Sequence, residues 1–122
     1  MNVALWVGQI LLALICVVSG SLKSTQSRER MIATGQTAAK IVPLPYMRTA
    51  GVAELFAVLG LILPWATGVA PVLTPVAATG FGAMMVMAAT VHTRLREPQN
   101  VATNMGILAV CVFVAIGRYA AL

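Results

Sequence analysis

Glu54 is the residue of this sequence whose type and position most clearly call for a chemical role. It lies inside an apolar run, about 12 Å beyond Tyr46 by the helical rise per residue, too deep for its carboxyl group to reach water easily. In a membrane helix such an acidic side chain costs roughly 2.5–3.5 kcal/mol and normally faces a partner or a cavity. Three interpretations follow. Glu54 forms a buried pair with Lys23, Arg48 or His92, or it handles a ligand or a proton as a candidate general acid or base, or it is unpaired and protonated.

Three other polar side chains fall at a similar depth on the other apolar runs: Lys23, His92 and Asn104. Each continues a helical stripe of small or apolar residues, so each is expected to face the interior of a bundle. We therefore predict that Lys23, Glu54, His92 and Asn104 form the polar end of a ligand pocket. His92 on its own is also compatible with a residue that only marks the membrane interface.

The sulfur-containing side chains do not predict a metal site. Met84, Met85 and Met87 would suit copper(I), but methionine more commonly fills gaps in a core. Cys16 and Cys111 lie within apolar runs and are expected to be free thiols. A single histidine excludes a bis-histidine haem within one chain, and the sequence predicts no particular cofactor.

The composition predicts a membrane protein. Of the 122 residues 60% are hydrophobic and only 9% are charged, far below the roughly 25% charged residues of soluble domains. A soluble domain of this size could not cover its core with so few polar side chains. The net charge of +5 comes from basic residues placed between apolar runs, which indicates membrane orientation rather than nucleic-acid binding.

Four apolar runs have lengths that suit a bilayer core about 30 Å thick, and we predict helices over residues 3–22, 46–63, 71–92 and 101–121. The runs do not alternate, and lipid offers backbone groups no partners, so each span must be helical. Pro64 is expected to end the second helix. The fold class is therefore all-α, a single membrane four-helix bundle over residues 1–122.

Small residues at helical spacing predict where the helices pack against one another. On the first helix these are Gln9, Ala13, Cys16 and Gly20. On the second helix they are Ala50, Ala53, Ala57 and Gly60.

The distribution of basic residues predicts the topology. Seven of the eight lie in or beside two connections, residues 23–45 and 93–100, and only Arg118 lies on the opposite side. These connections should be cytoplasmic, with both termini outside, in the plasma membrane (the inner membrane of a bacterium). Ser24, Thr25 or Ser27 could cap a short helix in the first connection that ends at Gly35, the alternative being a disordered loop.

Several short motifs, in order, resemble the DoxX-like family of small membrane proteins. They are Ser-Gly-Ser-Leu-Lys at 19–23, Gly-Val-Ala-Glu at 51–54, Leu-Gly-Leu-Ile-Leu-Pro at 59–64 and Ala-Ala-Thr-Val-His at 88–92. Ser24 departs from the apolar residue often found after the lysine. The resemblance implies a four-helix membrane fold and a loose set of roles, which include subunits or membrane partners of redox enzymes and receptor-assembly helpers. Fold likeness alone does not choose among these roles.

The resulting functional hypothesis is a membrane helper subunit that binds a small hydrophobic molecule, such as a quinone, or docks a redox partner on its basic face. One alternative is a membrane enzyme that uses Glu54 to isomerise a lipid-soluble substrate or to open its epoxide. Another is an assembly factor without a ligand. The expected partners are the lipid bilayer and a hydrophobic molecule or a membrane protein, and a homo-oligomer is compatible with the sequence.

Overall fold

A computed structural model describes residues 1–122, which fold into helices without any strand. The four long helices are α1 (Asn2–Thr25), α3 (Leu44–Thr67), α4 (Leu73–Arg94) and α5 (Pro98–Ala120). The short helix α2 (Arg28–Ala33) and the 3-10 helix η1 (Thr37–Lys40) lie in the connection between α1 and α3. Each long helix has the length and hydropathy needed to cross a membrane, so the predicted all-α membrane four-helix bundle is confirmed.

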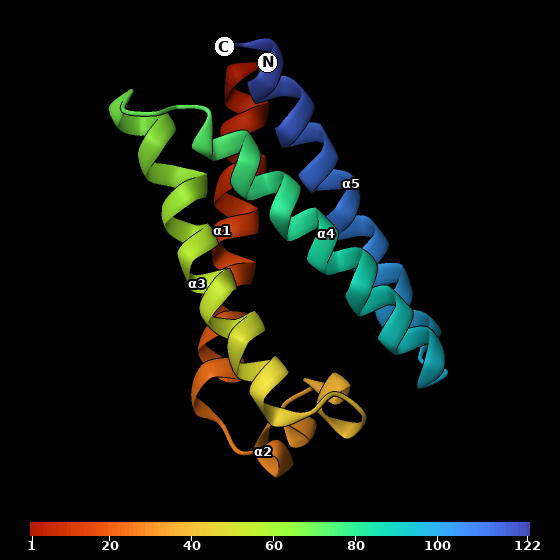
Figure 1. The fold of residues 1–122 in the computed structure, drawn as a ribbon. Helices are drawn as coiled ribbons and strands as arrows, with labels where there is room; N and C mark the ends of the chain where they lie inside the picture. The colour runs from red at the N-terminus through yellow and green to blue at the C-terminus, as the bar shows by residue number, and fades with distance from the viewer.

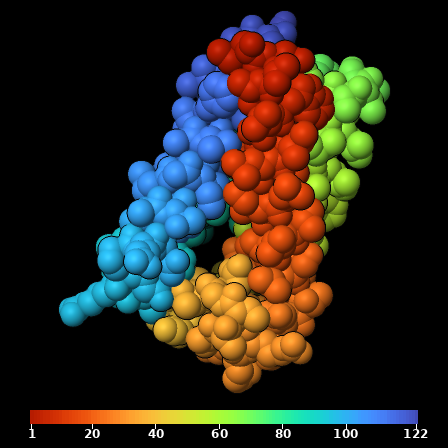
Figure 2. Space-filling view, turned by 180° about the vertical axis from the view of Figure 1, so that it is seen from behind, coloured from red at the N-terminus to blue at the C-terminus, as the bar shows by residue number.

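The four long helices form two pairs. Both termini lie at one end of the bundle together with the α3–α4 turn, and we call this the terminal end (Figure 1). The opposite end, with α2, η1 and the α4–α5 connection, is the loop end. The pair α1–α3 meets the pair α4–α5 toward the terminal end, and the two pairs diverge toward the loop end (Figures 1 and 2). The residues between α1 and α3 occupy part of the space that this divergence leaves (Figure 2).

The core is small because lipid, rather than protein, covers most of the apolar surface. It is built from residues on all four long helices, among them Leu12, Leu61, Phe81 and Val114. Cys16 and Cys111 also lie in this core as free thiols, as expected. Large apolar side chains elsewhere on the helices stay exposed, which suits a protein whose solvent is the bilayer.

The prediction that Pro64 ends the second helix is wrong, because α3 continues to Thr67. A proline inside a helix offers no N–H to the carbonyl group one turn earlier, here that of Gly60. The hydroxyl group of Thr74, on α4, donates a hydrogen bond of 2.9 Å to this carbonyl oxygen instead. The helix ends at Gly68, which adopts the left-handed conformation with φ +73°.

The other helix boundaries differ from the prediction by a few residues. The first helix includes Lys23 and runs to Thr25, and α4 is shifted to Leu73–Arg94. The last helix begins at Pro98, three residues before the predicted start, because proline is well suited to the first turn of a helix.

The connection between α1 and α3 is ordered, as one of the two sequence interpretations expected. The hydroxyl group of Ser27 caps α2 by accepting a hydrogen bond from the backbone N–H of Arg30. Met31, Ala39 and Met47 form a second small core that holds this connection against the start of α3. The connection is thereby fixed beside the helix that carries Glu54.

The predicted packing face of the second span is confirmed in part: Gly60 packs closely on α4, where an added Cβ atom would lie 2.9 Å from Cβ of Ala77, and Ala57 packs against the core. The buried residues of α3 include Met47, Gly51 and Glu54, whereas Ala50, Ala53, Ala57 and Gly60 are partly or fully accessible. Three of these four residues face α4 across a cavity described below. The predicted face of the first helix is buried, with Gln9, Ala13, Cys16 and Gly20 inside the bundle.

Candidate functional site

Glu54 lies at the interface of α1 and α3, where the two backbones approach closely. A Cβ atom added to Gly20 would lie 2.8 Å from the carbonyl oxygen of Gly51, and one added to Gly51 would lie 2.7 Å from Cβ of Lys23. Neither position has room for a larger residue without a shift of the helices. This close contact brings the end of α1 to the depth of Glu54.

The carboxyl group of Glu54 is completely buried and fully engaged by α1. Lys23 Nζ donates a hydrogen bond of 3.1 Å to Oε1, and this is also an ion pair. The hydroxyl oxygen of Ser19 lies 3.2 Å from Oε1 and 3.1 Å from Oε2. The expectation that Glu54 faces the bundle interior and reaches Lys23 is confirmed. A buried charge of this kind is tolerated because its partner and its hydrogen bonds offset the loss of hydration.

Two further groups support the pair from the side of the first connection and of α3. Gln36 Nε2 donates a hydrogen bond of 3.5 Å to the hydroxyl oxygen of Ser19. Arg48 Nη1 donates one of 2.9 Å to the backbone carbonyl of Lys23, one of the last carbonyl groups of α1. Arg48 therefore brings a second positive charge beside the pair without contacting Glu54.

His92 does not join this site, so of the candidate partners of Glu54 it is Lys23, and not His92, that forms the pair. Its Nδ1 lies 2.7 Å from Oε1 of Glu97, in the connection that follows α4. Oε1 also accepts hydrogen bonds from Thr37 (2.8 Å) and from Asn100 (3.2 Å). Hydrogen bonds from His92, Thr37 and Asn100 hold the pKa of Glu97 below its usual value. This cluster joins η1 to the ends of α4 and α5.

Asn104 also lies apart from the predicted site. It is buried on α5, and its amide nitrogen has no hydrogen-bond partner. The helices α4 and α5 diverge from α1 and α3 at this end of the bundle (Figure 1), which separates residues whose depths in the sequence are similar. Depth along a helix could be counted from the sequence, but the distance between the helix pairs could not.

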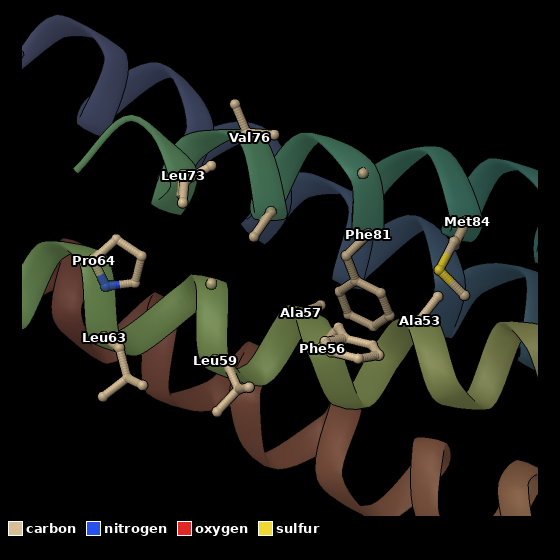
Figure 3. Close-up of a pocket in the computed structure, with 13 residues that line it drawn as sticks. Ala53, Phe56, Ala57, Leu59, Leu63, Pro64, Leu73, Val76, Phe81 and Met84 are labelled. Carbon is tan, nitrogen blue, oxygen red and sulfur yellow. The ribbon is translucent and has the colours of Figure 1, made fainter. Parts of the chain in front are cut away.

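Two cavities lie side by side between α3 and α4. The loop-end cavity has a volume of about 350 Å³ and is lined mainly by apolar residues, with Lys23 as its one charged residue. The terminal-end cavity, of about 610 Å³, is lined by apolar residues and glycines alone. Ala53 and Met84 line both cavities, so the two are neighbours that share these residues. Figure 3 shows the terminal-end cavity with Phe81 pointing from α4 toward α3, and with Pro64 and Leu73 at its far end.

A polar cluster at the terminal end was not predicted from the sequence. The guanidinium group of Arg118 is buried between the rings of Trp65 and Trp6, at 4.4 Å and 5.5 Å from their centroids. Its Nε donates a hydrogen bond of 2.6 Å to Gln9, and its Nη1 donates one of 2.8 Å to Asn2. Its Nη2 is buried without a partner. The sequence feature that could have predicted this cluster is the presence of two amide side chains, Asn2 and Gln9, on the first helix and of a single arginine on the last helix.

Glu54 itself lines neither of the two cavities, whereas Lys23 lines the loop-end cavity. The site thus consists of a buried carboxylate that holds a lysine, and a lysine that lies between this carboxylate and an apolar space. No solved structure and no curated protein is similar enough to the chain to be matched. The family model described as the DoxX-like family matches residues 7–114, which is most of the chain. The chain is therefore an integral, multi-pass membrane protein that belongs to the DoxX-like family.

Proposed function

We propose that the protein is a membrane helper subunit that binds a small hydrophobic molecule between α3 and α4. The observation that carries this proposal is the loop-end cavity, which joins an apolar lining to the amine of Lys23. Its volume of about 350 Å³ falls within the range of roughly 300–1,000 Å³ typical of ligand sites. Such sites combine an apolar wall with a few polar groups that orient the ligand.

Access to this cavity is lateral, from the surface that faces lipid. Tyr46 and Met87 line it and are exposed, at 68% and 69% of their possible surface. A lipid-soluble molecule could therefore enter from the bilayer without crossing water. A quinone meets this description, since its ring carbonyl groups could accept hydrogen bonds from Lys23.

The enzyme alternative receives less support from the geometry. A general acid or base must come within hydrogen-bond distance of the reacting group, directly or through one water molecule. The oxygens of Glu54 are engaged by Lys23 and Ser19, and the residue lines neither cavity. The arrangement favours Glu54 as the group that positions Lys23.

Mass spectrometry of the protein extracted from membranes tests the proposal. We expect a hydrophobic molecule to remain bound to the wild-type protein and to be lost from an Ala53→Phe variant, in which a ring fills the junction of the two cavities. Ala109→Phe places the same ring on an exposed site of α5 and is the matched control. Equal retention by both variants would mean that the molecule binds elsewhere and would contradict the proposal. Absence of any bound molecule from the wild type would favour an assembly factor without a ligand.

We also propose that the loop end is cytoplasmic and that both termini face outward across the plasma membrane. The basic residues of the two connections support this orientation. In a background without Cys16 and Cys111, single cysteines at positions 30 and 96 should react with an impermeant reagent only from the cytoplasmic side. A cysteine at position 67 should react only from outside, and the reverse pattern would overturn the orientation.

A further inference from the structure

We infer that the preferred ligand of this site is a long-chain fatty acid in its carboxylate form, with its tail lying along the seam between α3 and α4. This inference rests on the proposed function and adds to it the charge and the shape of the ligand. It is carried by two features of the seam: where its charges lie, and how far its apolar lining extends.

The charges lie at one end of the seam only. Lys23 lines the loop-end cavity, whereas Arg48 lies outside the lining and donates to the backbone carbonyl of Lys23. Glu54 balances the charge of Lys23, so these three groups leave an excess of one positive charge at this end. Glu54 engages one N–H of the lysine ammonium group, which has three to donate. A carboxylate balances the excess charge and accepts these remaining hydrogen bonds, whereas a neutral carbonyl or hydroxyl group leaves the charge unbalanced.

The apolar part of the seam is long and narrow. Lys23 lies level with Gly51, and the far end of the terminal-end cavity is at Pro64, about 20 Å away at the rise of an α-helix. This is roughly two-thirds of a hydrocarbon core about 30 Å thick. The two cavities share Ala53 and Met84 as lining residues, and no polar side chain lines the space beyond the loop end. An extended single chain fits this shape, while a two-chain phospholipid would need a second apolar seam.

The rings of Phe56, from α3, and of Phe81, from α4, both line the terminal-end cavity (Figure 3). Aromatic and aliphatic side chains of this kind contact a methylene chain without requiring a particular head group. The tail therefore contributes affinity through burial, and Lys23 with Arg48 contributes the selectivity for an acidic head.

Photocrosslinking with a fatty acid that carries a diazirine in its tail tests the inference, with the fatty alcohol of equal chain length as the uncharged probe. The full-length protein in lipid nanodiscs is labelled with each probe, and the labelled residues are mapped by mass spectrometry. We expect labels on α3 and α4 along the seam. In Arg48→Gln the ratio of labelling by the acid to labelling by the alcohol should fall roughly fivefold, the effect expected for the loss of one partly exposed charge. This variant leaves the Lys23–Glu54 pair intact. Arg94→Gln, at an exposed position, is the matched control.

The double variant Lys23→Met, Glu54→Gln removes the pair without leaving a buried charge. Because Arg48 keeps its charge, the acid-to-alcohol labelling ratio should fall, through loss of the hydrogen bonds from Lys23 to the head group, but should stay above one. Equal seam labelling by acid and alcohol in the wild type would overturn the preference for a carboxylate and leave the proposed hydrophobic site standing. Preferential labelling by a diazirine phospholipid would also overturn it. Labels spread over all four helices, and unchanged by Ala53→Phe, would overturn the inference and the proposed function together.

Discussion

Lys23 on α1 and Glu54 on α3, 31 positions apart in the chain, form an ion pair of 3.1 Å with a completely buried carboxyl group. The pair joins the two helices where their backbones are closest, at Gly20 and Gly51. Of the two side chains, only Lys23 lines the loop-end cavity, so the pair connects the buried carboxyl group to that cavity. The same contact therefore fixes the packing of two helices and holds a cation at the entrance to an apolar seam.

Replacing Lys23 alone should lower the stability of the protein more than removing both charges of the pair. Lys23→Met leaves the carboxyl group of Glu54 buried with only Ser19 as a partner, and we expect the free energy of unfolding to fall by about 3 kcal/mol. The double variant Lys23→Met, Glu54→Gln should recover most of this loss. Reversible unfolding of the single and double variants in bicelles measures the coupling. Additive losses would show that the two side chains do not stabilise each other.

Gly51→Ala should separate α1 from α3. The new methyl group would lie 2.7 Å from Cβ of Lys23 and 2.9 Å from the carbonyl oxygen of Gly20, and this backbone oxygen cannot move without the helix. Overpacking of this kind costs about 1–3 kcal/mol. The control is Gly106→Ala on α5, where the added carbon would meet nothing within 4 Å and alanine favours the helix. Equal unfolding free energies for the two variants would contradict the close contact.

The sequence predicted the spans well because their lengths and hydropathy are set by the bilayer, whatever the tertiary contacts. Glu54 and Lys23 could be paired from their depth and from the small residues around them. The prediction at Pro64 was wrong because a residue on another helix allows α3 to continue past the proline. The hydroxyl group of Thr74, on α4, donates a hydrogen bond to the carbonyl oxygen of Gly60, which Pro64 leaves without a partner. Local rules cannot anticipate such a partner.

His92 and Asn104 were misplaced for a different reason. Counting residues along a helix gives the depth of a side chain in the membrane. A contact between His92 and Glu54 would also require the pairs α1–α3 and α4–α5 to stay close at the loop end. They diverge there, and Glu97 engages His92 instead (Figure 1). Arg118 was noted only as a charge on the opposite side, because its partners lie at the other end of the chain.

Acid should loosen the contact between η1 and the α4–α5 connection. The hydrogen bonds from His92, Thr37 and Asn100 lower the pKa of Glu97 in the folded protein, so they stabilise the fold above the unfolded-state pKa of a glutamate. This contribution is lost as the pH falls through the lower pKa of the folded state. Protection of the backbone amides of residues 34–42, taken relative to their intrinsic exchange rates, should fall on acidification below about pH 4.3, the ordinary pKa of glutamate.

Glu97→Gln should give fast exchange of residues 34–42 already at neutral pH and remove most of its dependence on acid. Glu29→Gln changes an exposed carboxylate on α2 and should leave the wild-type profile unchanged. If Glu97→Gln retained the wild-type pH profile, another group would be responsible for the acid response.

Arg118→Lys should destabilise the terminal end although it preserves the charge. The guanidinium group lies over the rings of Trp6 and Trp65 while its N–H groups donate to Gln9 and Asn2, and a lysine ammonium group cannot do both. We expect a loss of about 1–3 kcal/mol, the range for leaving a buried polar group without its partner, here an amide oxygen. Arg94→Lys, at the exposed end of α4, is the control and should behave as the wild type.

In a Trp65→Leu background the difference in stability between arginine and lysine at position 118 should shrink, because one aromatic contact is gone. Thermal unfolding of the five proteins tests this. An Arg118→Lys variant as stable as the wild type would show that this position requires only a charge, without the aromatic contacts or directed hydrogen bonds.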